Sequence, residues 1–167
     1  DRAILDLFAG SASLAGAIGK QVNFVSNDIQ EYSKVLSQTY LVNLRDADIP
    51  DIDHIHQQVL DLVAANVQKE YLVDYNKLND IEDFNCLEEN QKDLINKDFS
   101  YDYHLFAKNY SGTWWSYEQC LWIDALREVA DEYKDKPIYP IFLSSLMYSM
   151  AYCSQGTGHY AQYRDAK

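Results

Sequence analysis

A short apolar run followed by a turn of small residues opens this chain. Residues 3–8 (AILDLF) lead directly into Gly10, and residues 11–13 (SAS) follow it. Such a run is typical of a buried parallel strand, and the small residues after it can form a helix that packs closely on the sheet. The turn leaves backbone N–H groups pointing outward, and Gly10 has no Cβ to keep a ligand away. We therefore predict a nucleotide-cofactor pocket on an α/β sheet.

A second strand pattern ends in a carboxylate. Residues 22–26 (VNFVS) are followed by Asn27 and Asp28, and Asp28 comes 18 residues after Gly10. A carboxylate in this place can accept hydrogen bonds from both ribose hydroxyls of a bound adenosine. The alternative is that Asp28, with Glu31 after it, is simply an acidic residue at a helix N-terminus.

Helical patterns follow both strand patterns, at residues 11–20 and 31–44. Strand, helix, strand and helix in this order open a doubly wound sheet, so the predicted class is α/β. A complete sheet of this kind needs more than two strands. Either sequence that is not present completes it, or further strands are hidden in the helical remainder.

The turn differs from two common phosphate-binding motifs. The dinucleotide fingerprint has three glycines, and here the three positions hold Gly10, Ala12 and Ala15. No Gly-Lys-Ser or Gly-Lys-Thr follows, so the turn is not a P-loop. These departures disfavour a dinucleotide-dependent oxidoreductase, which remains the weakest alternative.

The rest of the chain has helical signals. We expect Asp51 to cap a long helix and Ser116 with Gln119 to form a capping box at the start of another. Residues 81–95 have a weaker helical pattern, and the aromatic-rich residues 101–115 predict a structured loop. The last helix is expected from Tyr139 to Cys153, followed by Gly156 and Gly158.

Composition narrows the functional classes. The net charge of −12 argues against a nucleic-acid clamp built by this segment alone, because phosphate binding needs clustered Lys and Arg. Cys86, Cys120 and Cys153 form no CxxC pair, so no metal site is predicted, and they fit reduced core residues in a cytoplasmic protein. The apolar run 138–150 is shorter than the ~20 residues of a membrane span, so no membrane association is expected.

Four segments together resemble a known family. The segments DLFAGSASLAGAI (6–18) and VNFVSNDIQEYS (22–33) resemble the two cofactor motifs of Dam-like DNA adenine methyltransferases, and segments 111–127 and 157–163 resemble later parts. The resemblance implies a Rossmann-like S-adenosylmethionine-dependent methyltransferase fold with an incomplete sheet and a large helical insertion. It also implies methyl transfer from S-adenosylmethionine to the exocyclic amine of adenine in double-stranded DNA.

The resemblance assigns roles to residues of both motifs. Asp28 would hold the ribose of S-adenosylmethionine, and Ile29 would lie against its adenine ring. The methionine end would be lined by Phe8, Gly10 and Ser11. The other predicted cofactor-binding residues are Asp6, Ala12, Ser13 and Asn27. The family usually has Gly at the position of Ala12.

The family's catalytic motif, Asp-Pro-Pro-Tyr, is not found in the sequence. Its only prolines are Pro50, Pro137 and Pro140, and no two are adjacent. We therefore predict no catalytic residue here and expect a truncated chain, with the catalytic strand beyond Lys167. The abrupt start at Asp1, without Met, also suggests an excised fragment.

Three regions and one further alternative follow from this interpretation. Residues 1–45 would begin the methyltransferase domain, residues 46–135 would be a helical insertion with target-recognition elements, and residues 136–167 would return to the catalytic domain. The alternative is a catalytically inactive methyltransferase-like module that binds cofactor or a protein partner. An isolated half-sheet would expose strand edges, which also predicts a homodimer.

Overall fold

The structure is a computed structural model, and it describes residues 3–156 of the chain. The chain forms two compact units, each built from two separate stretches of sequence. Among the described residues, 3–50 and 130–147 are called the sheet unit here, and 51–129 and 148–156 the helical unit. The family-like segment 157–163 and Gly158 lie outside the described residues, and the predicted boundaries at 45 and 135 stay predictions.

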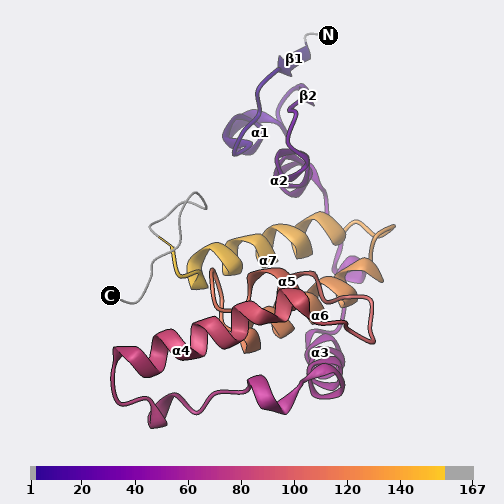
Figure 1. Ribbon diagram of the computed structural model, residues 1–167. Helices are drawn as coiled ribbons and strands as arrows, with labels where there is room; N and C mark the ends of the chain where they lie inside the picture. Colours follow the sequence, from indigo (N-terminus) through magenta and orange to yellow (C-terminus); the bar gives the residue numbers. More distant parts are fainter. Residues whose placement is uncertain (1–2, 157–167) are drawn as a thin grey trace. The chain divides into compact units, whose positions relative to one another are not determined.

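The sheet unit contains two parallel strands, β1 (Ala3–Asp6) and β2 (Asn23–Ser26) (Figure 1). The crossover between them contains α1 (Ser13–Ile18), and α2 (Glu31–Leu41) follows β2. This order confirms the predicted strand–helix–strand–helix beginning. Within residues 3–156 the sheet has these two strands, and the other elements are helices.

The two faces of the small sheet differ in burial. Ile4 pairs with Phe24, and both side chains are half-buried, whereas the next pair, Leu5 and Val25, is exposed. Successive side chains of a strand point to opposite faces, so one face is packed and the other presents apolar side chains without cover from the described residues.

Small residues let α1 approach α2 closely. A Cβ on Gly16 would lie 3.0 Å from the Tyr40 ring, and a Cβ on Gly19 would overlap the side chain of Leu41. Ser37, buried on α2, shares a 2.7 Å hydrogen bond with Ser26 at the end of β2. The small residues of α1 thus allow a close approach to α2, whereas the sequence predicted close packing of this helix on the sheet.

The helical unit is made of helices joined by short connections. It contains α3 (Ile52–Asn66), α4 (Ile81–Lys92), α5 (Leu105–Tyr110), most of α6 (Tyr117–Asp131) and the end of α7 (Tyr139–Cys153). Single 3-10 turns lie at Lys69–Tyr71, Tyr75–Lys77 and Asp93–Asn96, and Asp46–Asp48 forms another in the sheet unit. The core consists of Leu94, Ala107, Trp115, Tyr117, Cys120, Leu121 and Ile123.

Both predicted helix caps are present. The Asp51 carboxylate accepts hydrogen bonds from the backbone N–H groups of Asp53 and His54 at the start of α3. Before α6, the N–H of Ser116 donates to Gln119 Oε1 at 2.9 Å, and the N–H of Gln119 donates to Ser116 Oγ at 3.2 Å. These reciprocal bonds are a capping box, so the starts of both helices were readable from local sequence.

The prediction of a loop over residues 101–115 was wrong, because α5 lies inside it. No side chain next to α5 caps its first turn. Instead, Asp124 on α6 accepts hydrogen bonds from the N–H groups of Phe106 at 3.0 Å and Ala107 at 2.8 Å. A cap from a residue so distant in sequence leaves no local signal, which explains the missed helix.

The last helix, α7, has the predicted bounds. It buries Leu143 and Leu146, and within the sheet unit the Pro140 carbonyl accepts a 2.8 Å hydrogen bond from Thr39 of α2. Among residues 3–156, no helix combines the length and the apolar character needed to cross a membrane.

Candidate functional site

The turn after β1 has two residues in the left-handed backbone region. Gly10 has φ +51° and Ala12 has φ +59°. The Gly10 conformation accounts for glycine at that position, since L side chains are strained there. Ala12 is fully buried and adopts the same region with a Cβ, which gives a physical reason for the glycine that the family usually has at this position.

Asp28 is hydrogen-bonded to the same turn. Its Oδ2 accepts a 2.8 Å hydrogen bond from the N–H of Gly10, and its Oδ1 accepts a 2.9 Å bond from the N–H of Gln30. These N–H groups, Gly10 first, lower the pKa of the Asp28 carboxyl below its usual value. The structure thus brings Gly10 and Asp28, two of the predicted cofactor-binding residues, into direct contact.

Asn27 joins the ends of the two strands. Its N–H donates to the Asp6 carbonyl at 2.8 Å, its side-chain amide donates to the Leu7 carbonyl at 3.1 Å, and its carbonyl accepts from the N–H of Ala9 at 3.1 Å. These bonds fix the loop after β1 against the loop after β2. Asn27 therefore has a structural role, and its contact with cofactor stays a prediction.

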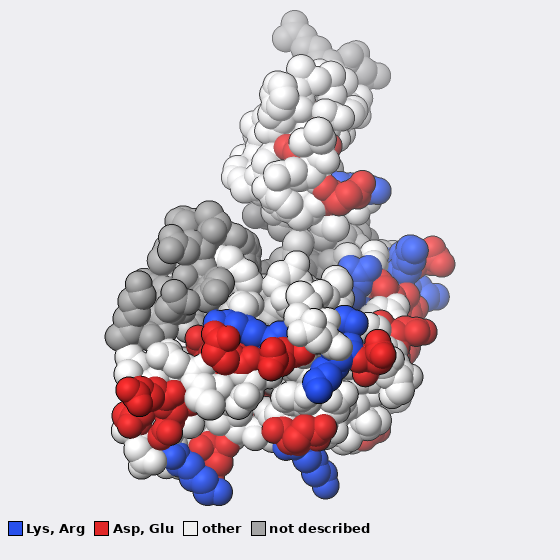
Figure 2. Space-filling view, in the orientation of Figure 1, with Lys and Arg blue, Asp and Glu red and all other residues white. Residues whose placement is uncertain are grey.

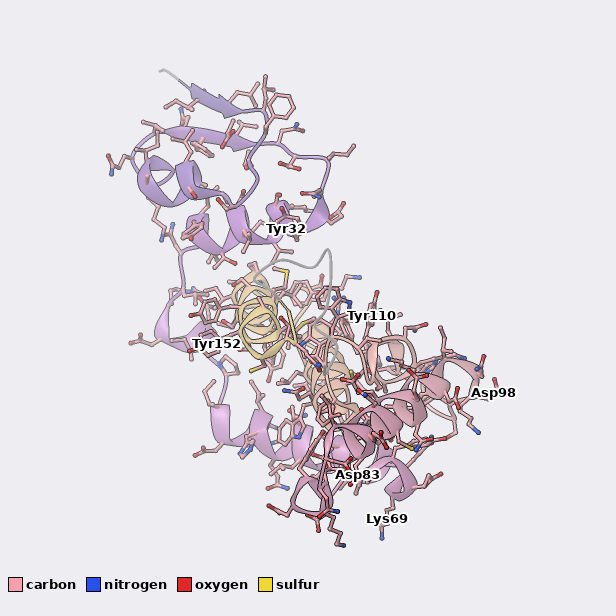
Figure 3. The ribbon with its side chains drawn as sticks, turned by 60° about the vertical axis from the view of Figure 1, so that its left-hand side comes forward. Tyr32, Lys69, Asp83, Asp98, Tyr110 and Tyr152 are labelled. Carbon is pink, nitrogen blue, oxygen red and sulfur yellow. The ribbon has the colours of Figure 1, made fainter. Side chains whose placement is uncertain are left out.

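The other predicted residues lie around this loop. Phe8 and Ile29 are 88% and 98% exposed. Ser11 and Ser13 share a 2.7 Å hydrogen bond between their hydroxyl oxygens, and the carboxylate of Asp6 accepts from the N–H of Phe8 at 3.4 Å. Figure 3 shows the side chains of the sheet unit as sticks, with Tyr32 of α2 labelled.

Most of the charged side chains belong to the helical unit. Residues 51–129 contain 16 acidic and 6 basic side chains. On the face drawn in Figure 2, the basic side chains are interspersed with acidic ones. The described residues contain no group of three or more His, Cys, Asp or Glu side chains placed to hold a metal ion.

Sequence reasoning missed two buried polar residues of the helical unit, Glu88 and Gln91 of α4. Their spacing of one helical turn was the available signal, because residues three apart share a helix face. Both line a pocket whose described lining residues all belong to the helical unit.

The parallel strand–helix–strand unit, with a glycine turn after the first strand and an acid after the second, is compatible with a partial Rossmann-like α/β fold. The D12 class N6 adenine-specific DNA methyltransferase family matches residues 1–167, and the chain belongs to this family. This confirms the resemblance to Dam-like adenine methyltransferases. No curated protein and no solved structure matched the chain.

Proposed function

We propose that this chain binds S-adenosylmethionine at the turn between β1 and α1, for methylation of the exocyclic amine of adenine in double-stranded DNA. The observation that carries the proposal is the 2.8 Å hydrogen bond from the N–H of Gly10 to Asp28 Oδ2. It unites the turn and the acid, and membership of an adenine-specific DNA methyltransferase family supplies the type of reaction.

Asp28 is the proposed ribose-binding residue. Each of its carboxylate oxygens accepts one backbone hydrogen bond and keeps a lone-pair site, so two ribose hydroxyls can still donate to it. The lowered pKa keeps the carboxyl ionised at neutral pH, which strengthens such bonds. The backbone contacts also fix the orientation of the carboxylate before a ligand arrives.

The exposed apolar residues are the proposed contacts for the rest of the cofactor. Ile29 would pack on the adenine ring, while Phe8, Gly10 and Ser11 would line the methionine end. A ligand that covers exposed apolar side chains gains roughly 25 cal/mol of binding free energy for each Å² of apolar surface removed from water. The remaining proposed residues, Asp6, Ala12, Ser13 and Asn27, shape the loop.

The cofactor supplies an electrophilic methyl group when it is bound. The residues of this chain bind and orient it, and no catalytic residue is assigned among them. Residues 46–135 are proposed as the region of target recognition. Their acidic character means that recognition there would rest on hydrogen bonds and apolar contacts more than on phosphate neutralisation.

Calorimetric titration of the chain with S-adenosylmethionine tests the proposal. Asp28→Asn should weaken binding at least about tenfold, because it removes the charge that accepts the ribose hydroxyls. Asp46→Asn makes the same charge change at an exposed site of the sheet unit and should leave affinity unchanged. Equal affinity for wild type and folded Asp28→Asn would contradict the ribose-binding role.

A second candidate is a methyltransferase-like module that is catalytically inactive. It is favoured by the same contacts of Asp28, since both carboxylate oxygens already bond to the protein backbone. If the folded chain bound no S-adenosylmethionine, this candidate would replace the first, and Asp28 would be a purely structural acid of the turn.

A further inference from the structure

The helical unit contains a pocket of about 430 Å³. Its walls come from the 3-10 turn at Tyr75–Lys77, from α4, from the turn before α6, from the first turn of α6, and from the end of α7 with the residues that follow it. All of its described lining residues belong to the helical unit. A pocket of this size falls within the range of small-molecule sites. None of the proposed cofactor-binding residues contributes to it.

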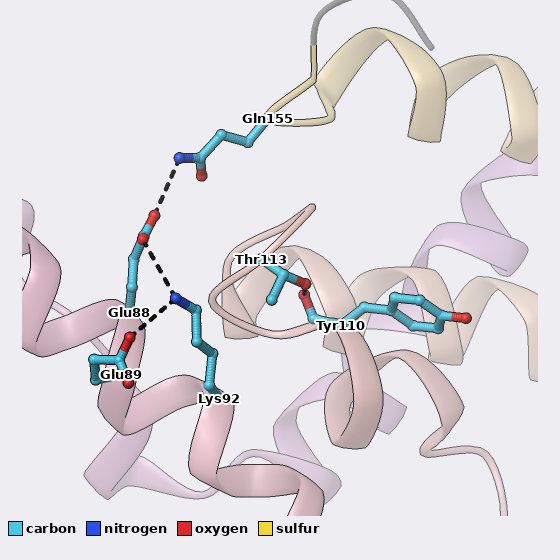
Figure 4. Close-up of polar contacts among 6 residues, drawn as sticks. All are labelled: Glu88, Glu89, Lys92, Tyr110, Thr113 and Gln155. Carbon is cyan, nitrogen blue, oxygen red and sulfur yellow. Dashed lines mark hydrogen bonds and ion pairs between the residues drawn. The ribbon is translucent and has the colours of Figure 1, made fainter. Parts of the chain in front are cut away.

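Glu88 supplies a buried hydrogen-bond acceptor to this pocket. Its side chain is 8% exposed, and Oε1 accepts a 3.1 Å hydrogen bond from the amide of Gln155 (Figure 4). Lys92 lies 3.9 Å from Oε2 but only 3.1 Å from Glu89, so its stronger contact is with Glu89. Oε2 of Glu88 therefore retains accepting capacity inside the pocket.

Gln91 supplies a buried donor one helical turn further along α4. The residue is 3% exposed, and Oε1 accepts a 3.1 Å hydrogen bond from the N–H of Tyr117. That bond fixes which end of the amide is oxygen, because an N–H needs an acceptor. The other end, Nε2, has no hydrogen-bond partner among the described residues. Burial of an unpaired donor is costly, and a ligand would relieve that cost.

We propose that this pocket binds a nucleobase with an amino group beside an unprotonated ring nitrogen, as in adenine and cytosine. The amino group donates to Glu88, and the ring nitrogen accepts from Gln91 Nε2. The two residues lie on one face of α4, so one planar edge can meet both. Phe84, Trp115 and Tyr75 line the same pocket and give a heteroaromatic ring apolar and aromatic surface.

The polar groups disfavour charged ligands. A cation near Glu88 would also meet the N–H donors of Gln91, and Lys92 already lies close to that carboxylate. An anion near Gln91 would meet the negative charge of Glu88. A neutral ligand that offers one donor beside one acceptor satisfies both residues.

The test is ligand-detected NMR titration of the whole chain with cytidine and adenosine. Uridine and inosine are the matched controls, because a carbonyl replaces the amino group and the adjacent ring nitrogen carries hydrogen, which reverses the edge. We expect cytidine to bind about tenfold or more tightly than uridine, and adenosine likewise over inosine. Separate titrations with cytidine and adenosine show which of the two nucleobases binds. Binding of either one supports the site.

Gln91→Glu is the informative variant. It retains an oxygen for the N–H of Tyr117 but removes the donor, so cytidine binding should fall at least about tenfold. Asn85→Asp makes the same charge change at an exposed position of α4 and should leave binding unchanged. Asp28→Asn should also leave it unchanged, which separates this site from the proposed cofactor site.

Four results would overturn the proposal. The first three are equal binding of the reversed-edge nucleosides, undiminished cytidine binding by folded Gln91→Glu, and no binding of either cytidine or adenosine by the folded chain. Adenosine binding that depends on Asp28 but not on Gln91 would assign adenosine to the cofactor site and, without cytidine binding, would likewise reject the pocket.

Discussion

Two residues of one turn meet the same backbone constraint differently. Gly10 and Ala12 both have positive φ, but only Ala12 carries a Cβ, which is buried. The left-handed region costs an L residue about 1–2 kcal/mol. Burial of one methyl group returns about 0.8 kcal/mol, and alanine loses about 0.5–1 kcal/mol less chain entropy than glycine on folding. These opposing contributions nearly cancel, so alanine is tolerated at this position.

Gly10→Ala is expected to destabilise the sheet unit by about 0.5–1 kcal/mol, because the left-handed strain of about 1–2 kcal/mol is partly offset by the smaller entropy loss of alanine. The new Cβ would lie 3.9 Å from the Phe8 carbonyl oxygen, which is ordinary contact, so no steric overlap adds to this cost. Gly10→Asn should lose less, because asparagine tolerates the left-handed region. Urea unfolding measures both variants. A Gly10→Ala variant as stable as the wild type would contradict the left-handed backbone conformation of residue 10.

At the scale of elements, the starts of α3 and α6 could be predicted because their caps are local. Asp51 precedes α3 directly, and Ser116 and Gln119 are three residues apart at the start of α6. The start of α5 depends on Asp124, and a pattern within α5 could not reveal it. The same reason limits how far the two candidate ligand sites could be predicted from the sequence. The Gly10–Asp28 pair follows from motif spacing, whereas the pocket at Gln91 depends on contacts with segments distant in sequence.

Asp124 also gives the cap of α5 a pH dependence. Burial raises the pKa of its carboxyl to about 6, opposed by the N–H groups of Ala107 and Phe106 and by the charge of His104. A folded-state pKa above the unfolded value means that the contribution of Asp124 to stability is fully present below about pH 4. It is lost as the pH rises through about 6, by roughly 2–3 kcal/mol.

Asp124→Asn should therefore be most destabilising at low pH. Asparagine offers one acceptor where the aspartate serves two N–H groups, but it carries no charge whose burial costs energy. The difference in unfolding free energy between wild type and variant should shrink between pH 4 and pH 6.5. Urea titrations across that range measure it, and a difference that did not change with pH would contradict the raised pKa.

At the scale of the whole molecule, the division into two compact units separates the two proposed ligand sites. The candidate cofactor residues belong to the sheet unit, and the residues that line the pocket belong to the helical unit. Sequence patterns predicted the change from strands to helices near residue 45. The family resemblance predicted a return to the catalytic domain over residues 136–167, and residues 130–147 belong to the sheet unit. The exact bounds of such a return depend on tertiary contacts, so the predicted bounds stay predictions. Leu5 and Val25 expose apolar surface on the sheet that a second copy could cover, and the predicted homodimer stays a prediction.

Ligands should therefore protect different segments from hydrogen exchange. Saturation at 100 times the dissociation constant stabilises a site by about 2.7 kcal/mol, which slows exchange through opening of that site roughly 100-fold. S-adenosylmethionine is expected to slow exchange in β1, β2 and the start of α2, and cytidine in α4 and the first turn of α6. Mass spectrometry of peptides from the whole chain measures both. Protection of α4 by S-adenosylmethionine, with β1 and β2 unchanged, would move the cofactor's adenine into the helical pocket and refute the proposed cofactor site.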